Sequence, residues 1–335
     1  MLLWSFRVDA FPETLKYGYS SCLSCHISPS GGGALTQYGR SLSEQILSSF
    51  SYAGEGQLGH YDFGLPTWLA LGGDGRYVNI ARETNEEPEY KFIQMQRDFE
   101  IGAITNYVFG AARYGIYQDT TSESRTHYAG LSGIIRGVYL RYGKFAPAYG
   151  TNTPDHTAFG RSAIGLGQGK ESYNAEASYI GKLGEVFLTA ITHTKTTDDF
   201  GKTVYTSDDS GYAARLTWFA AKGVRLGSSF MRLDSSTKYG GFCELGYNKW
   251  LYLGLDVNEL VTEAERALYS YGKLHAELLK GFNFLYESNY SQKDGSYREN
   301  NWGFDWYPRP HFQFLGKVLN QQGKGGYMLL SHYWF

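Results

Sequence analysis

The residues best suited to chemistry lie in one short stretch, Ser21-Cys22-Leu23-Ser24-Cys25-His26. Two cysteines three positions apart, followed at once by histidine, form the CxxCH pattern of covalent c-type haem attachment. Each thiol adds to one vinyl group of the haem, and the adjacent imidazole reaches the iron from one face. The chain has only three cysteines, so the pattern predicts one covalent haem c, with Cys22 and Cys25 as anchors and His26 as an iron ligand.

Two other interpretations of this cysteine pair stay open. In an oxidising compartment the two thiols could form a disulfide that pins a loop. A structural zinc site would need four ligands. The sequence shows no second Cys/His pair at a suitable spacing, which counts against zinc.

Composition narrows the class of protein. The 335 residues carry a formal net charge of −2, with 17% aromatic and 19% charged residues. A charge this close to zero counts against nucleic-acid binding. The sequence has no apolar run long enough for a transmembrane helix. Many aromatic and few charged residues fit a membrane β-barrel, in which apolar residues occupy alternate positions.

Residues 1–10 resemble the remains of a secretory signal peptide. Residues 1–6 are mostly apolar, and Val8-Asp9-Ala10 could end at a cleavage site after Ala10. The apolar core is short and lacks a basic start, so the signal is either truncated or mis-started. The alternative is a frayed apolar tail. Haem attachment through thioethers requires export in bacteria, which agrees with a signal.

Residues 11–60 form the predicted haem-binding segment. The stretch 28–33 holds one proline and three glycines and must be a turn. Its glycines either let the backbone approach a bulky cofactor or form a flexible connector, and both interpretations stay open. Ser41-Leu42-Ser43-Glu44 has the form of a capping box, which predicts a short helix ending near Phe50 that covers the haem or the barrel mouth.

After Pro66 the hydrophobic pattern has a period of two. In 250–262, for example, leucine and valine occupy one face, while Tyr252, Asp256 and Asn258 occupy the other. Sixteen such stretches, each long enough to cross a bilayer at a tilt, predict an all-β fold, a 16-stranded antiparallel transmembrane β-barrel over residues 66–335. The predicted strands are 66–80, 90–101, 103–118, 124–135, 136–147, 170–181, 183–195, 207–220, 221–234, 237–248, 250–262, 266–280, 281–293, 297–307, 309–321 and 324–335.

The predicted links alternate between tight and long, for example Lys280-Gly281 and 196–206. Outer-membrane barrels have short periplasmic turns and longer outer loops, and an even number of strands leaves both termini in the periplasm. The pattern therefore predicts a bacterial outer-membrane protein with both termini periplasmic. The last residues, Ser331-His332-Tyr333-Trp334-Phe335, resemble the C-terminal signal of such barrels.

The link 146–169 is the longest and is expected to fold inward as a constriction loop. A loop of this length in a compact protein is usually functional, and sixteen strands leave an open channel unless something fills it. The alternative is a surface loop with solvated charges. The predicted pore-lining residues are Asp155, His156 and Arg161 in the link, with Arg141, Lys273, Glu277, Arg113 and Glu244 on the wall.

Three histidines are candidates for the second axial position on a haem iron. His60 lies just before the barrel, His311 begins the fifteenth predicted strand, and His332 follows the lumen-facing phase of the last one. Each could approach a haem at the periplasmic mouth, but a histidine in such a position is more often an ordinary hydrogen-bonding one. Met95 falls on the lipid-facing phase and is set aside.

No motif indicates an enzyme. Gly201-Lys202-Thr203 lacks the upstream glycine of a phosphate-binding loop, and no G-x-S-x-G elbow occurs. Cys243 falls on the lipid-facing phase of its strand and is expected to act as a small apolar residue.

Taken with these motifs, the chain resembles a group of bacterial outer-membrane, porin-like β-barrels that carry a small N-terminal c-type haem motif. The residues that carry the resemblance are Phe11-Pro12-Glu13, Lys16-Tyr17-Gly18-Tyr19, Cys22 to His26, Pro29 to Gly33, Tyr38-Gly39-Arg40, Arg141-Tyr142-Gly143-Lys144-Phe145 and Pro154-Asp155-His156-Thr157-Ala158-Phe159.

The resemblance implies a redox or pore role at the outer membrane. We expect electron exchange with a periplasmic cytochrome, conduction of small solutes, or both. The alternative is a passive porin or oligomeric scaffold, in which Cys22 and Cys25 form a disulfide or the haem is only structural. By analogy with large porins, the expected partners are outer-membrane lipid and further copies of the chain, which could enclose lipid between them.

Overall fold

The computed structural model describes residues 12–56, 64–83, 87–116, 122–151, 159–167, 169–197, 203–206, 209–293 and 297–335. The predicted signal remnant, residues 1–10, lies outside this range, as do His60, Asp155 and His156. None of the described helices is long and apolar enough to cross a membrane.

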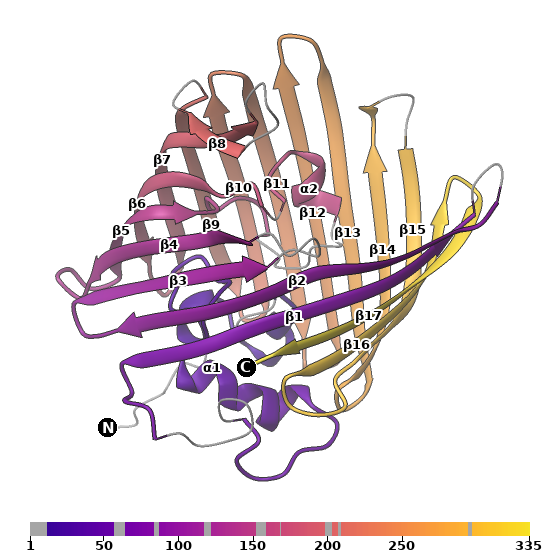
Figure 1. Cartoon of the computed structure of the whole chain (residues 1–335), viewed down its shortest axis with the longest axis horizontal. Helices are drawn as coiled ribbons and strands as arrows, with labels where there is room; N and C mark the ends of the chain where they lie inside the picture. The colour runs from indigo at the N-terminus through magenta and orange to yellow at the C-terminus, as the bar shows by residue number, and fades with distance from the viewer. Residues whose placement is uncertain are drawn as a thin grey trace.

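Sixteen antiparallel strands close into one barrel (Figure 1), as the period-two pattern predicts. The first strand, β1, pairs with both β2 and the last strand, β17, so the sheet has no edge. A seventeenth strand, β8, pairs only with β7 and is absent from the prediction. The strands are β1 (Leu69–Arg82), β2 (Glu89–Ile104), β3 (Val108–Ile116), β4 (Ser122–Ser132), β5 (Val138–Phe145), β6 (Ser172–Ile180), β7 (Gly184–Thr197), β8 (Thr203–Thr206), β9 (Gly211–Ala221), β10 (Val224–Leu233), β11 (Ser236–Tyr247), β12 (Leu251–Thr262), β13 (Arg266–Leu279), β14 (Phe282–Ser291), β15 (Tyr297–Trp306), β16 (Phe312–Gln321) and β17 (Lys324–Trp334).

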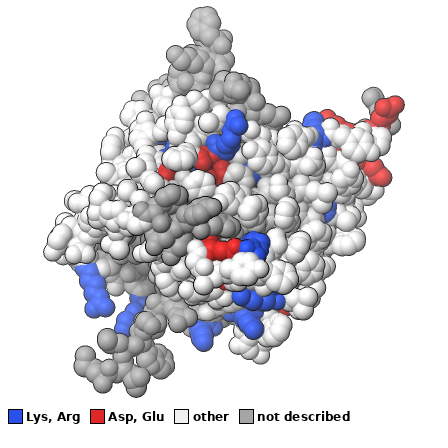
Figure 2. Space-filling model, turned by 60° about the horizontal axis from the view of Figure 1, so that its bottom comes forward, with Lys and Arg blue, Asp and Glu red and all other residues white. Residues whose placement is uncertain are grey.

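Alternation of side chains separates an apolar outer wall from a polar lumen. On β12, Leu255 is 49% exposed, whereas the neighbouring Asp256 is 2% exposed and points inward. Cys243 on β11 is exposed on the outer side, as predicted. In Figure 2 the visible surface carries few acidic or basic side chains. The outer wall is therefore suited to contact with lipid.

The seam between the first and last strands depends on a glycine. Gly73 and Phe335 exchange two backbone hydrogen bonds, each 3.1 Å long. The Phe335 ring lies so close that a Cβ at position 73 would meet it at 2.5 Å. A side chain larger than hydrogen would displace this ring.

The links do not alternate strictly in length, contrary to the prediction. We call the end of the barrel that holds the links 105–107, 133–137, 181–183, 222–223, 248–250, 280–281 and 307–311 the turn end, and the opposite end the loop end. The loop end has the longest links, but 234–235 and 322–323 there are as short as any at the turn end. The start of β1 and the end of β17 both lie at the turn end.

Residues 12–56, which we call the N-terminal insert, lie in the lumen and across its mouth at the turn end (Figure 1), where Phe50 and Tyr52 are exposed. The insert contains η1 (Pro12–Tyr17), η2 (Cys22–Ser24), α1 (Gln37–Leu42) and a turn of π-helix, η3 (Ser43–Leu47). It follows the inner wall and contacts strands and turn-end links on several sides of the barrel. Hydrogen bonds join Lys16 to Asn283, Ser20 to Arg225, Ser28 to Arg141, Leu71 to Arg40, and Ser43 to His311.

The helix of the insert begins earlier than predicted. Thr36, not Ser41, is the N-cap residue, and its hydroxyl accepts a hydrogen bond from the Gly39 N–H at 3.1 Å. The Ser41 hydroxyl instead donates to the Tyr38 carbonyl. The Glu44 carboxylate accepts from the Gly56 N–H at 2.8 Å. The capping-box interpretation of Ser41-Leu42-Ser43-Glu44 is therefore wrong.

The long link between β5 and β6 lies inside the barrel. We call its described residues 146–151 and 159–167, which include α2 (Phe159–Ala163), the link insert. Tyr149, Ile164 and Leu166 form one buried cluster with wall residues that include Met231 and Tyr269. The Gly150 N–H donates to Ser229 Oγ at 2.9 Å, so the link crosses the lumen from β5 to β10.

Candidate haem site

The CxxCH stretch forms a compact turn that orients the histidine. Cys22 begins the short helix η2, and its carbonyl accepts hydrogen bonds from the N–H groups of Cys25 and His26. His26 then pairs with Leu35 in an isolated β-bridge. His26 Nδ1 lies 3.1 Å from the carbonyl oxygen of Gly33. A histidine that donates one N–H to a carbonyl keeps its other nitrogen as a lone pair, which is the arrangement of metal-ligating imidazoles.

The imidazole lines a cavity of about 570 Å³ inside the barrel. The N-terminal insert bounds this cavity on one side, and residues of the link insert, including Arg161 and Leu166, bound it on another. The size falls within the range of pockets that hold small molecules and cofactors. A group bound there would be held between the two inserts and the barrel wall.

The glycine turn lies against Cys22 and His26. Gly31, Gly32 and Gly33 all have positive φ, between 70° and 84°, and all line the cavity. A Cβ on Gly31 would lie 3.0 Å from Cys22 Sγ and 3.9 Å from the His26 ring. Of the two interpretations of this turn, close approach of the backbone fits these contacts better than a loose connector.

Arg141 on β5 fixes the glycine turn to the wall. Its guanidinium donates to Ser28 Oγ and Ser30 Oγ, both at 2.9 Å, and to Glu176 at 2.7 Å. The side chains of Arg141 and Glu176 are nearly fully buried. Arg141 lines the cavity, and its hydrogen bonds to Ser28 and Ser30 hold the segment that carries His26.

The two cysteines fit a haem unequally. Cys22 is half-buried, and burial raises the pKa of its thiol to about 11. Cys25 is fully buried in a cluster with Tyr19 and Leu42. Cys22 and Cys25 are not joined by a disulfide. Of the three residues of the motif, only His26 borders the cavity; Cys22 and Cys25 are not among its lining residues, and Cys25 would have to turn out of its cluster to form a thioether.

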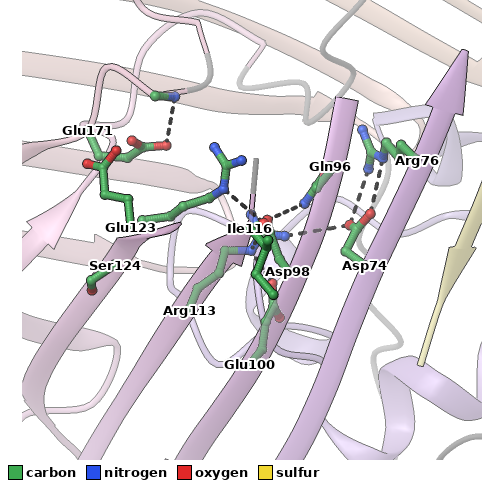
Figure 3. Close-up of polar contacts among 12 residues, drawn as sticks. Asp74, Arg76, Gln96, Asp98, Glu100, Arg113, Ile116, Glu123, Ser124 and Glu171 are labelled. Carbon is green, nitrogen blue, oxygen red and sulfur yellow. Dashed lines mark hydrogen bonds and ion pairs between the residues drawn. The ribbon is translucent and has the colours of Figure 1, made fainter. Parts of the chain in front are cut away.

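Charges on the cavity wall are arranged in buried ion pairs (Figure 3). Arg113 on β3 lies 3.1 Å from Asp98, 3.5 Å from Asp74, and in contact with Glu100. Arg125 pairs with Asp98 at 2.8 Å. Because each of these three carboxylates faces a guanidinium, this part of the wall carries no strong excess of either charge.

The structure places the candidate second iron ligands, His332 and His311, in different surroundings. His332 lines the cavity; its Nδ1 lies 2.9 Å from Gln313 Oε1, and its Nε2 lies 3.0 Å from Asp74. His311 is fully buried, lies outside the residues that line the cavity, and donates its backbone N–H to Ser43. The structure therefore brings His332, but not His311, to the same cavity as His26.

Met95 faces the lumen, and its predicted lipid-facing orientation is wrong. The register between β1 and β2 shifts at Arg76, because Gln96 pairs with Arg76 while Gln94 pairs with Tyr77. This bulge leaves Met95 as an extra residue. Met95 lines the cavity and packs against a buried cluster on β1, β14, β16 and β17. A single inserted residue changes the side-chain phase, and a period-two pattern does not reveal it.

Two predicted pore-wall charges instead hold the N-terminal insert. Lys273 on β13 pairs with Glu13. Glu277 accepts a hydrogen bond from the Tyr17 hydroxyl at 2.5 Å and lies 3.5 Å from Lys16 Nζ. Burial alone would raise the pKa of Glu13, but the charges of Lys273 and His275 outweigh it and hold that pKa below its usual value.

Two other predicted residues, Arg161 and Glu244, also lie inside the barrel. Arg161 borders the cavity and donates to the carbonyls of Tyr149 and Leu166, and burial lowers its pKa to about 10. Glu244 on β11 pairs with Arg225 at 2.7 Å. Within the described ranges, no three His, Cys, Asp or Glu side chains are gathered so that they could hold a metal ion.

No protein-family model and no curated protein sequence matches the chain. Solved structures of outer-membrane proteins do resemble it. OmpTΔL8, a loop-deletion mutant of the Vibrio cholerae outer-membrane protein OmpT, has a TM-score of 0.61 and 8% identity, covering 80% of this chain and 99% of its own. Salmonella typhi OmpF, solved in complex with daunomycin, has a TM-score of 0.59 and 11% identity over 80% and 97%. A mutant of the Rh. blastica porin has a TM-score of 0.56 and 12% identity over 80% and 100%. At these identities the likeness is one of fold, and the fold is the closed, 16-stranded, porin-like β-barrel.

Proposed function

We propose that this protein is a bacterial outer-membrane barrel that carries one covalent c-type haem in its lumen. Cys22 and Cys25 would bind the haem through thioethers, and His26 would ligate the iron. The turn end, with both termini, would face the periplasm. There the haem would exchange electrons with a soluble periplasmic cytochrome.

The observation that carries the proposal is the orientation of His26. Its Nδ1 is held at the Gly33 carbonyl, and the ring borders a cavity inside the barrel. Three glycines with positive φ and the Arg141 hydrogen bonds keep the backbone of this turn in place. A disulfide alone would need neither an oriented imidazole nor a cavity beside it.

A bound haem supplies one-electron redox chemistry, and the chain supplies its setting. His26 would ligate the iron, and His332, which borders the same cavity, is our candidate for a second ligand once its Nε2 gives up the contact with Asp74. The paired charges around Arg113 would surround the cofactor with little net charge. A single haem cannot bridge a membrane about 30 Å thick. Electron exchange would therefore take place at the turn end.

The test is a haem stain and an intact-mass measurement on protein exported by a bacterium that matures c-type cytochromes. We expect one haem mass per chain and a sharp reduced α-band. Cys22→Ala and Cys25→Ala should each lose a thioether, whereas Cys243→Ala, on the outer wall, should keep the full haem content. A chain that carries no added mass at Cys22 and Cys25 would refute the haem proposal.

The second candidate function is a passive porin, and the porin-like fold favours it. Here Cys22 and Cys25 would form a disulfide, or the haem would be structural. A reduction potential and electron transfer from a periplasmic cytochrome distinguish the two candidates, because a redox-silent haem leaves only the passive role. Single-channel conductance would then measure how far the two inserts restrict solutes.

We further propose that copies of the chain associate in the membrane. The outer wall is broadly apolar, with large exposed side chains such as Trp218, Leu216 and Trp302, which could contact lipid or a neighbouring barrel. Native mass spectrometry from mild detergent would give the number of chains and any lipid held between them. A monomer at all detergent concentrations would contradict association.

A further inference from the structure

Basic side chains are concentrated at the turn end. Five consecutive turn-end links, from 133–137 to 280–281, each contain one lysine or arginine, and no turn-end link contains an acidic residue. All five basic side chains are exposed. We call Arg136, Lys182, Lys222, Lys249 and Lys280 the basic arc, which follows the rim from β4 to β14. Figure 2 shows Lys and Arg side chains along the lower edge of the view.

The loop end has the opposite character. Acidic residues occupy its described links, including Glu83, Asp209, Asp234, Glu263 and Glu265. Basic residues near that end are paired with acids: Lys91 lies 2.7 Å from Glu89, and Lys293 lies 2.7 Å from Glu265. Although the net charge of the chain is near zero, its exposed links are basic at the turn end and mostly acidic at the loop end.

Large apolar side chains lie directly beside the basic arc. Ile134, Ile135, Leu183, Trp250 and Leu279 are each more than half exposed. Lys249 Nζ lies 5.3 Å from the centre of the Trp250 ring. Aromatic and apolar residues next to lysine mark the boundary between hydrocarbon and head groups, where the apolar body enters the lipid and the charge reaches the phosphates.

We propose that the basic arc binds the head groups of anionic phospholipids in the leaflet at the turn end. The inference rests on the membrane insertion in the proposed function, but not on the haem. Basic residues near a membrane surface each attract anionic lipid by an amount worth about fivefold in binding. An acidic soluble protein could also recognise these charges. The flanking apolar side chains favour lipid, because exposed apolar and aromatic residues beside basic ones are typical of the boundary between hydrocarbon and head groups.

The experiment compares nanodiscs of phosphatidylglycerol mixed with phosphatidylethanolamine. Native mass spectrometry of the released barrel measures which lipid stays bound. The test variant replaces all five residues of the basic arc with glutamine. The matched control replaces five basic residues near the loop end with glutamine, namely Arg82, Lys91, Arg266, Lys293 and Lys324. Both variants lose the same charge, and none of the ten replaced residues lines the cavity.

We expect wild type and control to retain phosphatidylglycerol about fivefold or more over its share of the mixture. High salt should reduce this preference, and the basic-arc variant should lose it. Equal retention by wild type and basic-arc variant overturns the inference. Binding of polyglutamate, without a lipid preference, would also overturn it and would identify the arc as a protein-docking surface. A chain that fails to enter nanodiscs contradicts the membrane part of the proposed function instead.

Discussion

The two inserts share one lumen but are attached to it by different balances of contacts. The N-terminal insert, which carries the CxxCH stretch, is held largely by charged side chains that reach inward from the wall. The link insert has a large buried apolar cluster, and hydrogen bonds to Arg215, Ser229 and Asp256 add to it. We therefore expect the two inserts to respond differently to changes in pH, in buried charge and in side-chain volume.

Wall charges position the N-terminal insert at its start and at its glycine turn. Lys273 pairs with Glu13, and Glu277 contacts Lys16 and Tyr17. Arg141 holds the glycine turn through Ser28 and Ser30. Buried ion pairs add little net stability, but they are directional and costly to break on one side only. Such contacts suit a segment that must present one imidazole in a defined orientation.

The link insert relies mainly on a buried cluster. Tyr149 is fully buried against wall residues such as Met231 and Tyr269. Its hydroxyl has no hydrogen-bond partner among the described residues. Apolar packing is insensitive to pH and depends on volume. We therefore expect the two inserts to respond to opposite kinds of substitution.

Removing the Tyr149 ring should have the largest effect. Tyr149→Ala leaves a cavity and should cost about 3–5 kcal/mol. The link insert should then leave the wall, so the thermal midpoint should fall and the conductance should rise. Haem content should stay unchanged. Tyr149→Phe is the matched control, since it keeps the ring and removes a buried hydroxyl without a partner, and should cost less than about 1 kcal/mol. Equal effects of the two substitutions would show that packing does not hold this insert.

Arg141→Gln should affect the other insert. It leaves Glu176 buried without its cation and frees Ser28 and Ser30, at a cost of about 2–4 kcal/mol. Hydrogen exchange of residues 26–35 should accelerate, while the link insert keeps its protection. Arg136→Gln, at an exposed turn, is the control. Adding Glu176→Gln should recover part of the loss, because it removes the buried charge. Unchanged exchange at 26–35 would mean that the turn holds its shape without Arg141.

Much of the fold could be predicted from the sequence because every barrel strand repeats the same period-two hydrophobic pattern. All sixteen barrel strands occur where the period-two pattern places them, with ends that differ by a few residues. Local exceptions were not readable. The bulge at Met95 shifts the phase of β2 by one residue, and the cap at Thr36 precedes a more conspicuous Ser-x-x-Glu pattern.

The candidate site was readable only in part, because its contacts join distant positions. The CxxCH stretch by itself indicates covalent haem attachment. Nothing near Arg141 in the sequence indicates that it reaches Ser28, and nothing near Lys273 indicates Glu13. Such pairs depend on where an insert lies inside a closed barrel. Spacing along the chain gives no information about that position.

Acid should loosen the N-terminal insert and leave the link insert in place. The pKa of Glu13 is lowered in the folded protein, so its ion pair with Lys273 contributes its full stabilisation above the unfolded pKa of about 4.3. This stabilisation declines below that value and is lost as pH falls through the lower, folded pKa. We expect loss of this ion pair to destabilise the docked insert by about 1–2 kcal/mol. The loss should appear as faster hydrogen exchange in residues 12–20 at pH 3 than at pH 6, after correction for the intrinsic rate. Glu13→Gln should show the fast exchange at both pH values, because its side chain does not titrate. If wild type and Glu13→Gln change equally between these pH values, another group controls the docking. Residues 164–166 should exchange alike at both, since Ile164 and Leu166 pack in the buried apolar cluster. Thr151 is left out of this comparison because its hydrogen bonds go to the carboxylate of Asp256.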